Sequence, residues 1–516
     1  PWVPALEALD PTGSGRLQAR ARGRGGAPAA HAADLALEGV AFSSSDGRQA
    51  GEGLGGDLSV EATAAAGGWD LDLGIDIAQG AVYLEPWYLE AGSRPLALDA
   101  AARHGPGGLE LTALSFRQPG VLAVNAEGAP LWSPGAGAGS GEVSFSVPDL
   151  GPLYSTWLQP LAAGTPLDRL ETTGGVSGEL SLADGRPRAL ELRLDDVHAD
   201  DREQRFGLYG VTGELGWAAD GPRPAWLQWE GGHLWRLRLG GARLEARAEA
   251  GSLVLTTPLS LPLLDGAAVV DTLRLDLDGA DGPRGELAGY LKPLSMSALS
   301  RAFGWPVFQG QVSGVLPRVS LAGRRVTLDG ALLVRLFDGE VVVRDLVLEA
   351  PFGVVPELRA NLDIRDLDLA PLTGAFSFGL IEGRVTGRVH DLVLQNWQPV
   401  AFDARLETPP GDDSRHRISQ RAVDSLTRVG GGAGLSGALF LGLFEEFRYD
   451  RLGLGCRLAD GTCAMSGVGP AEDGYYIVEG AGLPRIDVIG YNRRVDWNIL
   501  VQRLKRVTET GPALVQ

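Results

Sequence analysis

The chain has 516 residues, of which 44% are hydrophobic and 22% are charged, and its formal net charge is −19. This acidic balance argues against a nucleic-acid partner, because phosphate binding needs clustered Lys and Arg that outweigh the acids. The longest apolar run, Leu435–Phe444, is about half of the roughly 18–20 residues that a membrane-spanning helix needs, so we expect no transmembrane helix in this chain.

Alternating apolar and polar residues predict β-strands along most of the chain. Residues 69–77 read Trp-Asp-Leu-Asp-Leu-Gly-Ile-Asp-Ile, and residues 190–194 and 273–278 follow the same period of two. Such strands have one apolar and one polar face. Asp-Gly pairs that separate alternating segments predict hairpin turns at 184–185, 329–330, 338–339 and 460–461. We therefore expect a mostly β fold with few helices.

A repeated phrase indicates how the chain is organised. Residues 294–314 and 367–387 align without a gap, at an offset of 383 − 310 = 73 residues, and both copies end in Gly-x-Val-[Ser/Thr]-Gly. A third copy of that ending lies at 174–178. Self-similarity at a fixed period indicates stacked supersecondary units. We expect short helices at the repeat joints, near 295–303 and 370–376.

Four segments follow from this organisation. The first two are β repeat regions, of which the second opens with a short helix. The third holds two repeats of about 73 residues, and the fourth is a C-terminal cap with an amphipathic helix and a disulfide hairpin. Their bounds are 1–146, 147–286, 287–410 and 411–516.

The C-terminal cap carries the clearest helical pattern. In Ile418–Val429 the apolar residues Ile418, Ala422, Leu426 and Val429 share one face, and three glycines follow. The apolar stretch 435–447 predicts a second, buried or interface-facing helix. Both helices are expected to cap the β structure, since stacked repeats need a covered end.

The two cysteines, Cys456 and Cys463, flank the Asp460-Gly461 turn. A hairpin there places them close enough to form a disulfide. A disulfide implies an oxidising compartment such as the bacterial periplasm. The alternative is two unpaired thiols in a cytosolic protein. A zinc site is not expected, because no His lies at ligand spacing.

Catalytic patterns are scarce, so we expect a protein that is not an enzyme and has no metal or cofactor. The six histidines are scattered without a metal-binding or catalytic spacing. The carboxylate pairs 195–196, 200–201 and 412–413 lie in polar runs and predict solvated turns. The glycines at 430–432 follow no strand and precede no Lys, so they do not form a phosphate-binding loop.

Several motifs together resemble a known family. They are the short helix followed by Gly-x-Val-[Ser/Thr]-Gly, the strand phrase LFDGEVVVRDL at 336–346, and the terminal phrases beginning ISQRAVDSLTRVGGG at 418 and FRYDRLGLGCRLADGTCAMSG at 447. This pattern is similar to the C-terminal portion of bacterial AsmA-like, bridge-type lipid-transport proteins of the YdbH type, whose relatives include TamB and YhdP. The likeness covers Leu287–Gln395 and the terminus, about the last 230 residues.

The resemblance implies a periplasmic bridge that carries phospholipid between the inner and outer membranes. It also implies attachment to the inner membrane through an N-terminal anchor absent from this chain, and a small outer-membrane lipoprotein as a partner at the C-terminal end. The implied fold is an elongated, repeat-built antiparallel sheet that is curled into an open, taco-like groove, with short helices at repeat joints and near the C-terminus.

Amphipathic strands laid side by side would independently create such a groove. Their apolar faces would bind the phospholipid acyl chains, and their charged faces would meet water. The sequence shows no equally long apolar partner sheet to bury these faces. The side chains expected to line the groove alternate with polar residues: Leu237, Leu239, Leu273, Leu275, Leu277, Leu332, Val334, Leu336, Leu358, Leu362 and Ile364.

Other functions remain compatible with the sequence. A structural or adhesive β-repeat protein would show the same alternation, although solenoid repeats are usually ~20–30 residues long. An envelope-assembly factor without lipid transport is a further alternative. A polymer-acting enzyme would need convergent acids beside an aromatic platform such as Trp226, Trp229 and Trp235.

Overall fold

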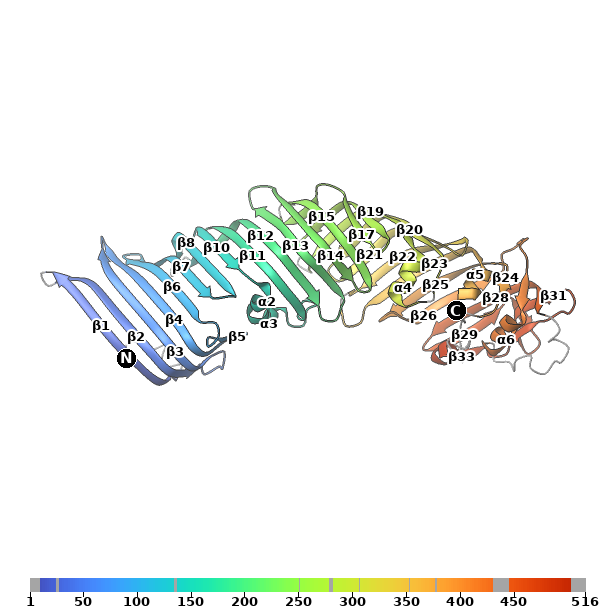
Figure 1. The fold of residues 1–516 in the computed structure, drawn as a ribbon, viewed down its shortest axis with the longest axis horizontal. Helices are drawn as coiled ribbons and strands as arrows, with labels where there is room; N and C mark the ends of the chain where they lie inside the picture. Colours follow the sequence, from blue (N-terminus) through green and yellow to red (C-terminus); the bar gives the residue numbers. More distant parts are fainter. Residues whose placement is uncertain are drawn as a thin grey trace, which may run out of the picture. The chain divides into compact units, whose positions relative to one another are not determined.

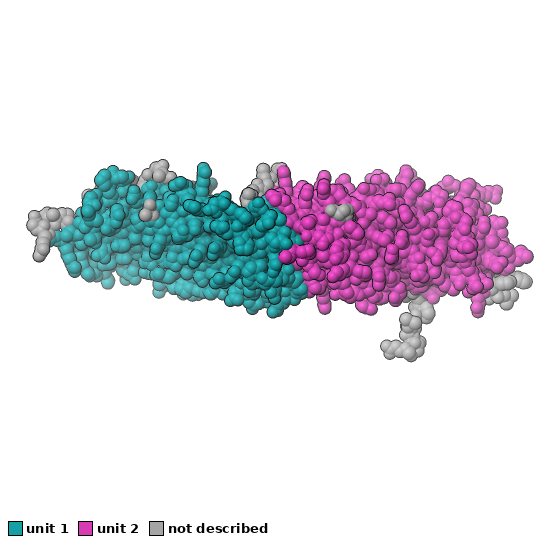
Figure 2. Space-filling model, turned by 90° about the horizontal axis from the view of Figure 1, so that it is seen from above, with its two compact units in different colours: residues 1–235, 241–256 teal, residues 236–240, 257–516 magenta. Residues whose placement is uncertain are grey.

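The computed structural model describes residues 10–24, 27–133, 137–249, 251–277, 282–305, 307–351, 353–375, 378–429 and 445–502. The protein is 69% strand and 9% helix, which confirms the expected mostly β, antiparallel fold with a few short helices. It divides into two compact units (Figure 2), formed by residues 1–235 with 241–256 and by residues 236–240 with 257–516. The four repeat-based segments remain a prediction.

Unit 1 is an antiparallel meander in which successive long strands pair with each other (Figure 1). A helical segment joins β10 to β11. The elements of this part of the chain are β1 (Thr12–Arg24), β2 (Ala27–Ser43), β3 (Gln49–Ala65), β4 (Gly68–Leu84), β5 (Trp87–Glu90), β6 (Leu96–Gly105), β7 (Gly108–Gln118), β8 (Leu122–Ser133), β9 (Gly137–Ala138), β10 (Gly141–Val147), α2 (Leu150–Leu153), the π-helix η1 (Tyr154–Leu158), α3 (Gln159–Ala162), β11 (Leu170–Ala183), β12 (Arg186–Asp201), β13 (Phe206–Ala218), β14 (Arg223–Leu234), β15 (Leu237–Glu249) and β16 (Ser252–Leu255).

Unit 2 continues the same architecture and adds a second, smaller sheet. Its main sheet has the order β17-β18-β19-β20-β21-β22-β23-β25-β26-β28-β29-β33, and the smaller sheet joins β24, β27, β28 and β31 with β30 and β32. The elements are β17 (Leu259–Leu263), β18 (Gly266–Asp276), β19 (Arg284–Ser295), α4 (Met296–Phe303), β20 (Gly310–Ala322), β21 (Arg325–Leu336), β22 (Gly339–Glu349), β23 (Glu357–Asp368), α5 (Leu369–Ala375), β24 (Ile381–Glu382), β25 (Arg384–Gln395), β26 (Gln398–Glu407), β27 (Arg417–Ser419), α6 (Gln420–Val429), β28 (Glu446–Ala459), β29 (Thr462–Gly467), β30 (Gly469–Ala471), β31 (Gly474–Ala481), β32 (Val488–Gly490) and β33 (Arg494–Asp496).

Register shifts recur on neighbouring strands and account for the curl of the sheet. In unit 2 they interrupt the pairing of four successive strands, at Leu328/Ala331, Arg344/Val347, Ala360/Leu362 and His390/Val393. A bulge bends its strand and increases the local right-handed twist. When bulges fall side by side, the bends add up across the sheet, which therefore curls instead of staying flat.

Two of the four expected Asp-Gly turns lie where the sequence places them. Asp184-Gly185 and Asp460-Gly461 close hairpins with positive φ at both residues, 49° and 70° in the first and 50° and 71° in the second. The turn expected at 338–339 is shifted to Phe337 and Asp338. The expectation at 329–330 is wrong, because these residues form a bulge inside β21. Bulges and turns favour the same residue types, because both often need a residue that tolerates a positive φ.

The repeated phrase corresponds to a structural unit of a joint helix followed by a new strand. Helices α4 and α5 lie at the expected joints, and the α2-η1-α3 segment precedes the third copy of the motif. The first glycine of each motif has a positive φ, of 97° at Gly174, 125° at Gly310 and 131° at Gly383. Any other residue would be strained there. The motif therefore lies at or near the start of the long strand that follows each helix, at the first residue of β20, directly before β25 and four residues into β11.

The C-terminal part of unit 2 has a fully buried core. Helix α6 packs here with Ala422 and Val423 at 0% and 1% exposure, beside Ile477 at 1%. The helix begins two residues later than expected, because Ile418 and Ser419 belong to β27. Residues 435–444 of the expected second helix lie outside the described residues, and its last residues, Glu446 and Phe447, instead begin β28.

Candidate functional site

Unit 1 carries an apolar face that crosses twelve strands in register. Directly paired residues of neighbouring strands point to the same side of a sheet. One residue per strand, from β1 to β14, forms a continuous ladder: Leu17, Leu35, Leu58, Ile75, Leu98, Phe116, Val124, Phe145, Gly178, Leu192, Leu215 and Ala225. We call the face that carries this ladder, and its counterpart in unit 2, the apolar face.

Unit 2 has a ladder of the same kind across eleven strands. It runs from β17 to β29 through Leu261, Ala268, Leu291, Gly314, Leu332, Val343, Leu362, Val389, Ala404, Cys456 and Met465. A parallel row contains Val334 and Ile364, both paired with Val341. The ladder thus brings Leu332, Val334, Leu362 and Ile364 of the expected groove onto one surface.

The remaining expected groove residues lie at the margins of this surface. Leu336 pairs with Gly310, and Leu358 pairs with Leu348 on one side and Leu394 on the other. On β18, Leu273 pairs with Leu287, and Leu275 pairs with Gly285. Leu239 pairs with Leu263, and Leu237 lies two residues before it on β15. Leu277 departs from the expectation, because it follows the last residue of β18 and is 61% exposed.

Exposure distinguishes the apolar faces from an ordinary core. Ten of the eleven expected groove residues, all except Leu277, are partly exposed. In unit 1 the ladder residue Leu17 is 66% exposed, and Val60, on the same face, is 43% exposed. Fully buried leucines in a packed sheet would be shielded from both sides. These faces instead leave apolar surface available to another molecule.

Part of the expected groove is covered by the protein itself. Leu332, Val334 and Leu336 pack against a buried cluster of Leu294, Met296 and Val312 at the start of α4. Leu362 and Ile364 pack against the C-terminal core. These positions therefore support the fold as well as forming part of the apolar face.

The opposite face of each sheet is charged, and its ion pairs link neighbouring strands. Arg193 bonds Glu214 at 3.1 Å in unit 1, and Arg344 bonds Asp363 at 2.7 Å in unit 2. The two side chains of the first pair are 71% and 53% exposed. Such pairs add little stability, typically about 0–1 kcal/mol. Their main effect is to keep this face in water, so that the sheet has two chemically distinct sides.

The hollows found in unit 1 lie on the charged face. One, of about 450 Å³, is lined by polar side chains that include Asn125, Ser144 and Arg193. Another, of about 410 Å³, includes Asp34 and Asp99. A ligand on the apolar face would therefore lie along an open surface of partly exposed side chains and not inside one of these hollows.

The second glycine of the repeat motif lies on the apolar face and makes space there. A Cβ at Gly178 would come within 2.7 Å of the Phe145 ring and 2.9 Å of Leu192. A Cβ at Gly314 would meet Leu332 at 2.9 Å, and one at Gly387 would meet Leu406 at 2.7 Å. The large side chains of adjacent strands thus fill the space above each glycine.

Two carboxylates that the sequence places in solvated turns are in fact buried. Asp201 is fully buried and accepts hydrogen bonds from Arg205, which lower the pKa of its carboxyl group. Asp412 is 4% exposed, and burial by itself would raise its pKa. Hydrogen bonds from His416, from Ser414 and from the backbone of Arg384 outweigh burial and lower that pKa to about 2. The expectation of solvated turns is wrong at these two positions.

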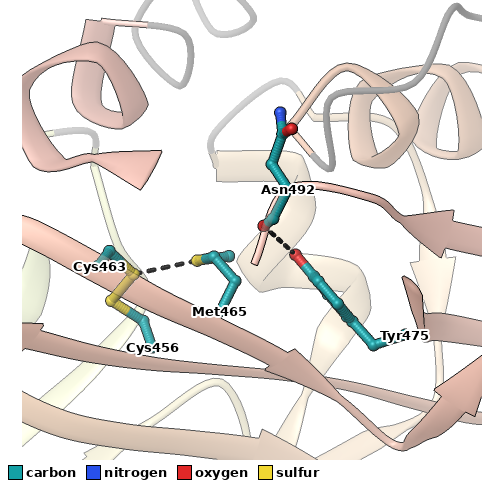
Figure 3. The surroundings of a disulfide bond; sticks show 5 residues. All are labelled: Cys456, Cys463, Met465, Tyr475 and Asn492. Carbon is teal, nitrogen blue, oxygen red and sulfur yellow. Dashed lines mark hydrogen bonds between the residues drawn. A yellow bond between two sulfur atoms is a disulfide. The ribbon is translucent and has the colours of Figure 1, made fainter. Parts of the chain in front are cut away.

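The expected disulfide between Cys456 and Cys463 is present, with Cα atoms 5.5 Å apart (Figure 3). Cys456 belongs to the apolar ladder, and its direct partner Met465 places Sδ 3.0 Å from Cys463 Sγ. The sequence predicts the disulfide, but the position of Cys456 on the apolar ladder follows only from the register of β26, β28 and β29.

The described residues contain no group of His, Cys, Asp and Glu side chains arranged to hold a metal ion. Their helices are also too short or too polar to cross a membrane.

The apolar ladder of unit 1 was not among the predicted site residues. Its signal was nevertheless visible in the alternation of residues 69–77 and 190–194.

In comparisons with known proteins, no family model matches the chain, and no curated protein matches it.

Proposed function

We propose that this chain binds phospholipid through its acyl chains, which lie along the apolar faces and pass from strand to strand. The observation that supports this most directly is the pair of register-matched ladders, with their partly exposed leucine and valine side chains. Leaving apolar surface in water costs about 25 cal/mol per Å². A hydrocarbon chain would remove that cost without any directional bond.

Sliding fits this surface better than a fixed binding pocket. Hydrophobic contact is non-directional, so an acyl chain meets similar side chains at each successive strand. The charged face stays in water while the lipid moves along the other side. No chemical step is required of the protein, in keeping with the expectation that it is not an enzyme.

The proposed setting is the periplasm, with the chain as part of a bridge between the inner and outer membranes. The Cys456–Cys463 disulfide supports an oxidising compartment. The resemblance of the motifs to AsmA-like proteins of the YdbH type supports the bridge. Anchoring to the inner membrane and contact with a small outer-membrane lipoprotein belong to the same proposal.

Mass spectrometry of lipid that co-purifies with the full chain tests this function. The informative variant is Leu275→Asp, which places a charge on the apolar face of β18 where an acyl chain would pass. Thr272→Asp is a matched control, because Thr272 is exposed on the opposite face of the same strand. Burying an unpaired charge beneath a lipid costs several kcal/mol. We expect L275D to lose bound phospholipid and T272D to keep it, with both variants folded.

If the parent protein carries no phospholipid after mild extraction, and L275D unfolds, then the apolar face is a structural core and the proposal is wrong. A structural or adhesive β-repeat protein, or an envelope-assembly factor without lipid transport, would then be the better reading.

A further inference from the structure

The two long edges of the unit 1 sheet differ in what covers the apolar face. One edge, which we call the helix edge, holds the connection from β10 to β11 through α2, η1 and α3 (Figure 1). The other, the hairpin edge, is formed by the tight turns that join β3 to β4, β6 to β7, β11 to β12 and β13 to β14.

At the helix edge the apolar face is closed by the protein. The ring of Trp157 in η1 packs against Trp87 and Phe116, with ring centroids 5.8 Å away in both cases. Its Nε1 donates a hydrogen bond of 2.9 Å to Gln118, and Trp87 Nε1 donates one of 2.9 Å to the backbone oxygen of Trp157. Both indole N–H groups are thus satisfied within the protein.

At the hairpin edge the apolar face ends in rings that are exposed or partly exposed. Trp69 on β4 pairs with His104 on β6, and its ring lies 5.4 Å from the ring of His31, across the small side chains of β3. Trp132 pairs with Leu111 and is 42% exposed, and Trp217 pairs with Leu190. Each of these residues lies on the apolar side of its strand. Each is one or two residues nearer to the hairpin turn than the leucine and alanine residues of that side.

Indole and imidazole rings suit the boundary between hydrocarbon and water. They present an apolar body together with a polar N–H, and Trp is enriched at the headgroup level of membranes for this reason. The turn between β13 and β14 at this edge also carries both signs of charge, since Arg188 and Arg223 lie 3.8 Å and 3.7 Å from Asp220. A headgroup with both a phosphate and an ammonium group matches this balance.

We propose that Trp69, Trp132 and Trp217, with His31 and His104, form the rim of unit 1 that contacts the zwitterionic headgroup of bound phospholipid, while the acyl chains point toward the helix edge. This inference rests on the proposed function and adds to it the orientation of the bound phospholipid. Lipid enters and leaves the apolar face through the hairpin edge, because η1 occupies the other.

Tryptophan quenching by nitroxide-labelled phosphatidylcholine tests the direction of binding. One probe carries the nitroxide on the choline headgroup, and the other carries it near the end of an acyl chain. The rim variant replaces Trp69, Trp132 and Trp217 by Phe, which keeps the apolar area, and the control variant Trp87→Phe removes an indole at the helix edge. We expect the headgroup probe to lose about half or more of its quenching in the rim variant, because the rim indoles are the ones it reaches, and to be unaffected in W87F.

Equal loss of headgroup quenching in the rim variant and in W87F overturns the proposed direction while leaving lipid binding intact. Unchanged headgroup quenching in the rim variant also overturns the proposed direction and leaves lipid binding intact. If neither probe quenches the parent protein and no lipid co-purifies with it, both this inference and the proposed function fail. Circular dichroism on each variant controls for folding, and if the triple variant is unfolded, the three single Phe variants give the same comparison.

Discussion

Ile75 in unit 1 and Ile477 in the C-terminal core both lie within antiparallel strands, yet they are in different environments. Ile75 is partly exposed on the apolar face, and its paired neighbours Leu58 and Leu98 leave that face open. Ile477 is 1% exposed among Ala422, Val423 and Tyr475. The same sheet chemistry therefore produces an open surface where no second layer of described residues covers it, and a core where α6 and a second sheet do.

This contrast separates binding surface from structural support. The C-terminal core has layers on both sides of its apolar residues, as stable domains generally do. The unit 1 sheet gains stability from its long strands, its cross-strand pairs and the helical segment at one edge. Residues that stabilise the fold and residues that would meet a ligand are thus largely in different places, which makes the comparison testable by substitution.

The largest effect is expected from truncating the same residue type in the two regions. Ile477→Ala should destabilise unit 2 by about 3–4 kcal/mol, because it leaves a cavity in a packed core. Ile75→Ala should cost about 1 kcal/mol, since its side chain is only partly buried. Urea unfolding, followed region by region with hydrogen exchange, measures both. Similar costs for the two variants would mean that the unit 1 face is a closed core.

Removing the disulfide should have the next largest effect and should be confined to the C-terminal part. Cys456→Ser with Cys463→Ser is expected to cost about 2–3 kcal/mol on the chain-entropy account of a short loop. Thiol labelling of the unreduced parent protein should detect no free cysteine. Labelling of both cysteines in protein taken directly from cells would remove the main support for a periplasmic location.

Acid should weaken the C-terminal part before it affects the apolar face of unit 1. The pKa of Asp412 is about 2 in the folded protein, below its ordinary value of 3.8. A lowered pKa contributes stability that is present above the unfolded value and is lost as pH falls from about 4 toward 2. The contribution is about 2 kcal/mol.

Asp412→Asn should remove this pH dependence, and the difference between parent and variant stability at pH 6 and at pH 2 measures it. Asp413→Asn is the matched control, because Asp413 is the neighbouring carboxylate and its side chain is not part of this hydrogen-bond set. An equal pH dependence in D412N and in the parent would contradict the assignment.

The smallest effect is expected on the charged face. Arg193→Ala breaks the exposed pair with Glu214 and should change stability by no more than about 0.5 kcal/mol. It should also leave bound lipid unchanged, because the side chain points away from the apolar ladder. Loss of lipid in R193A, measured by mass spectrometry, would place the ligand on the charged face, where the hollow of about 450 Å³ lies.

Bulges and turns show where sequence reasoning reached its limit. Asp184-Gly185 and Asp329-Gly330 have the same chemistry, yet the first closes a hairpin and the second bulges within β21. Both conformations use residues that tolerate positive φ. Only the pairing of β21 with its neighbours distinguishes them, and that pairing is set by contacts far apart in the chain.

Buried carboxylates show the same limit. Asp200-Asp201 and Asp412-Asp413 resemble solvated turns because each lies in a polar stretch. Arg205 lies four residues after Asp201, and His416 lies four residues after Asp412, so the local partners were visible. Their burial was not, because it depends on residues far away in the chain. The backbone N–H of Arg384 on β25 donates to Asp412, and Arg205, the partner of Asp201, donates to the backbone oxygen of Pro166.

The alternation of apolar and polar residues was enough to determine that the chain is mostly antiparallel sheet with two different faces, because side-chain direction has a period of two in any strand. The repeat located the joint helices, and the hairpin spacing located the disulfide. Tertiary structure alone decided which apolar residues became core and which stayed exposed. Exposure depends on whether another layer packs over a face, and a strand's own sequence carries the same pattern in both cases.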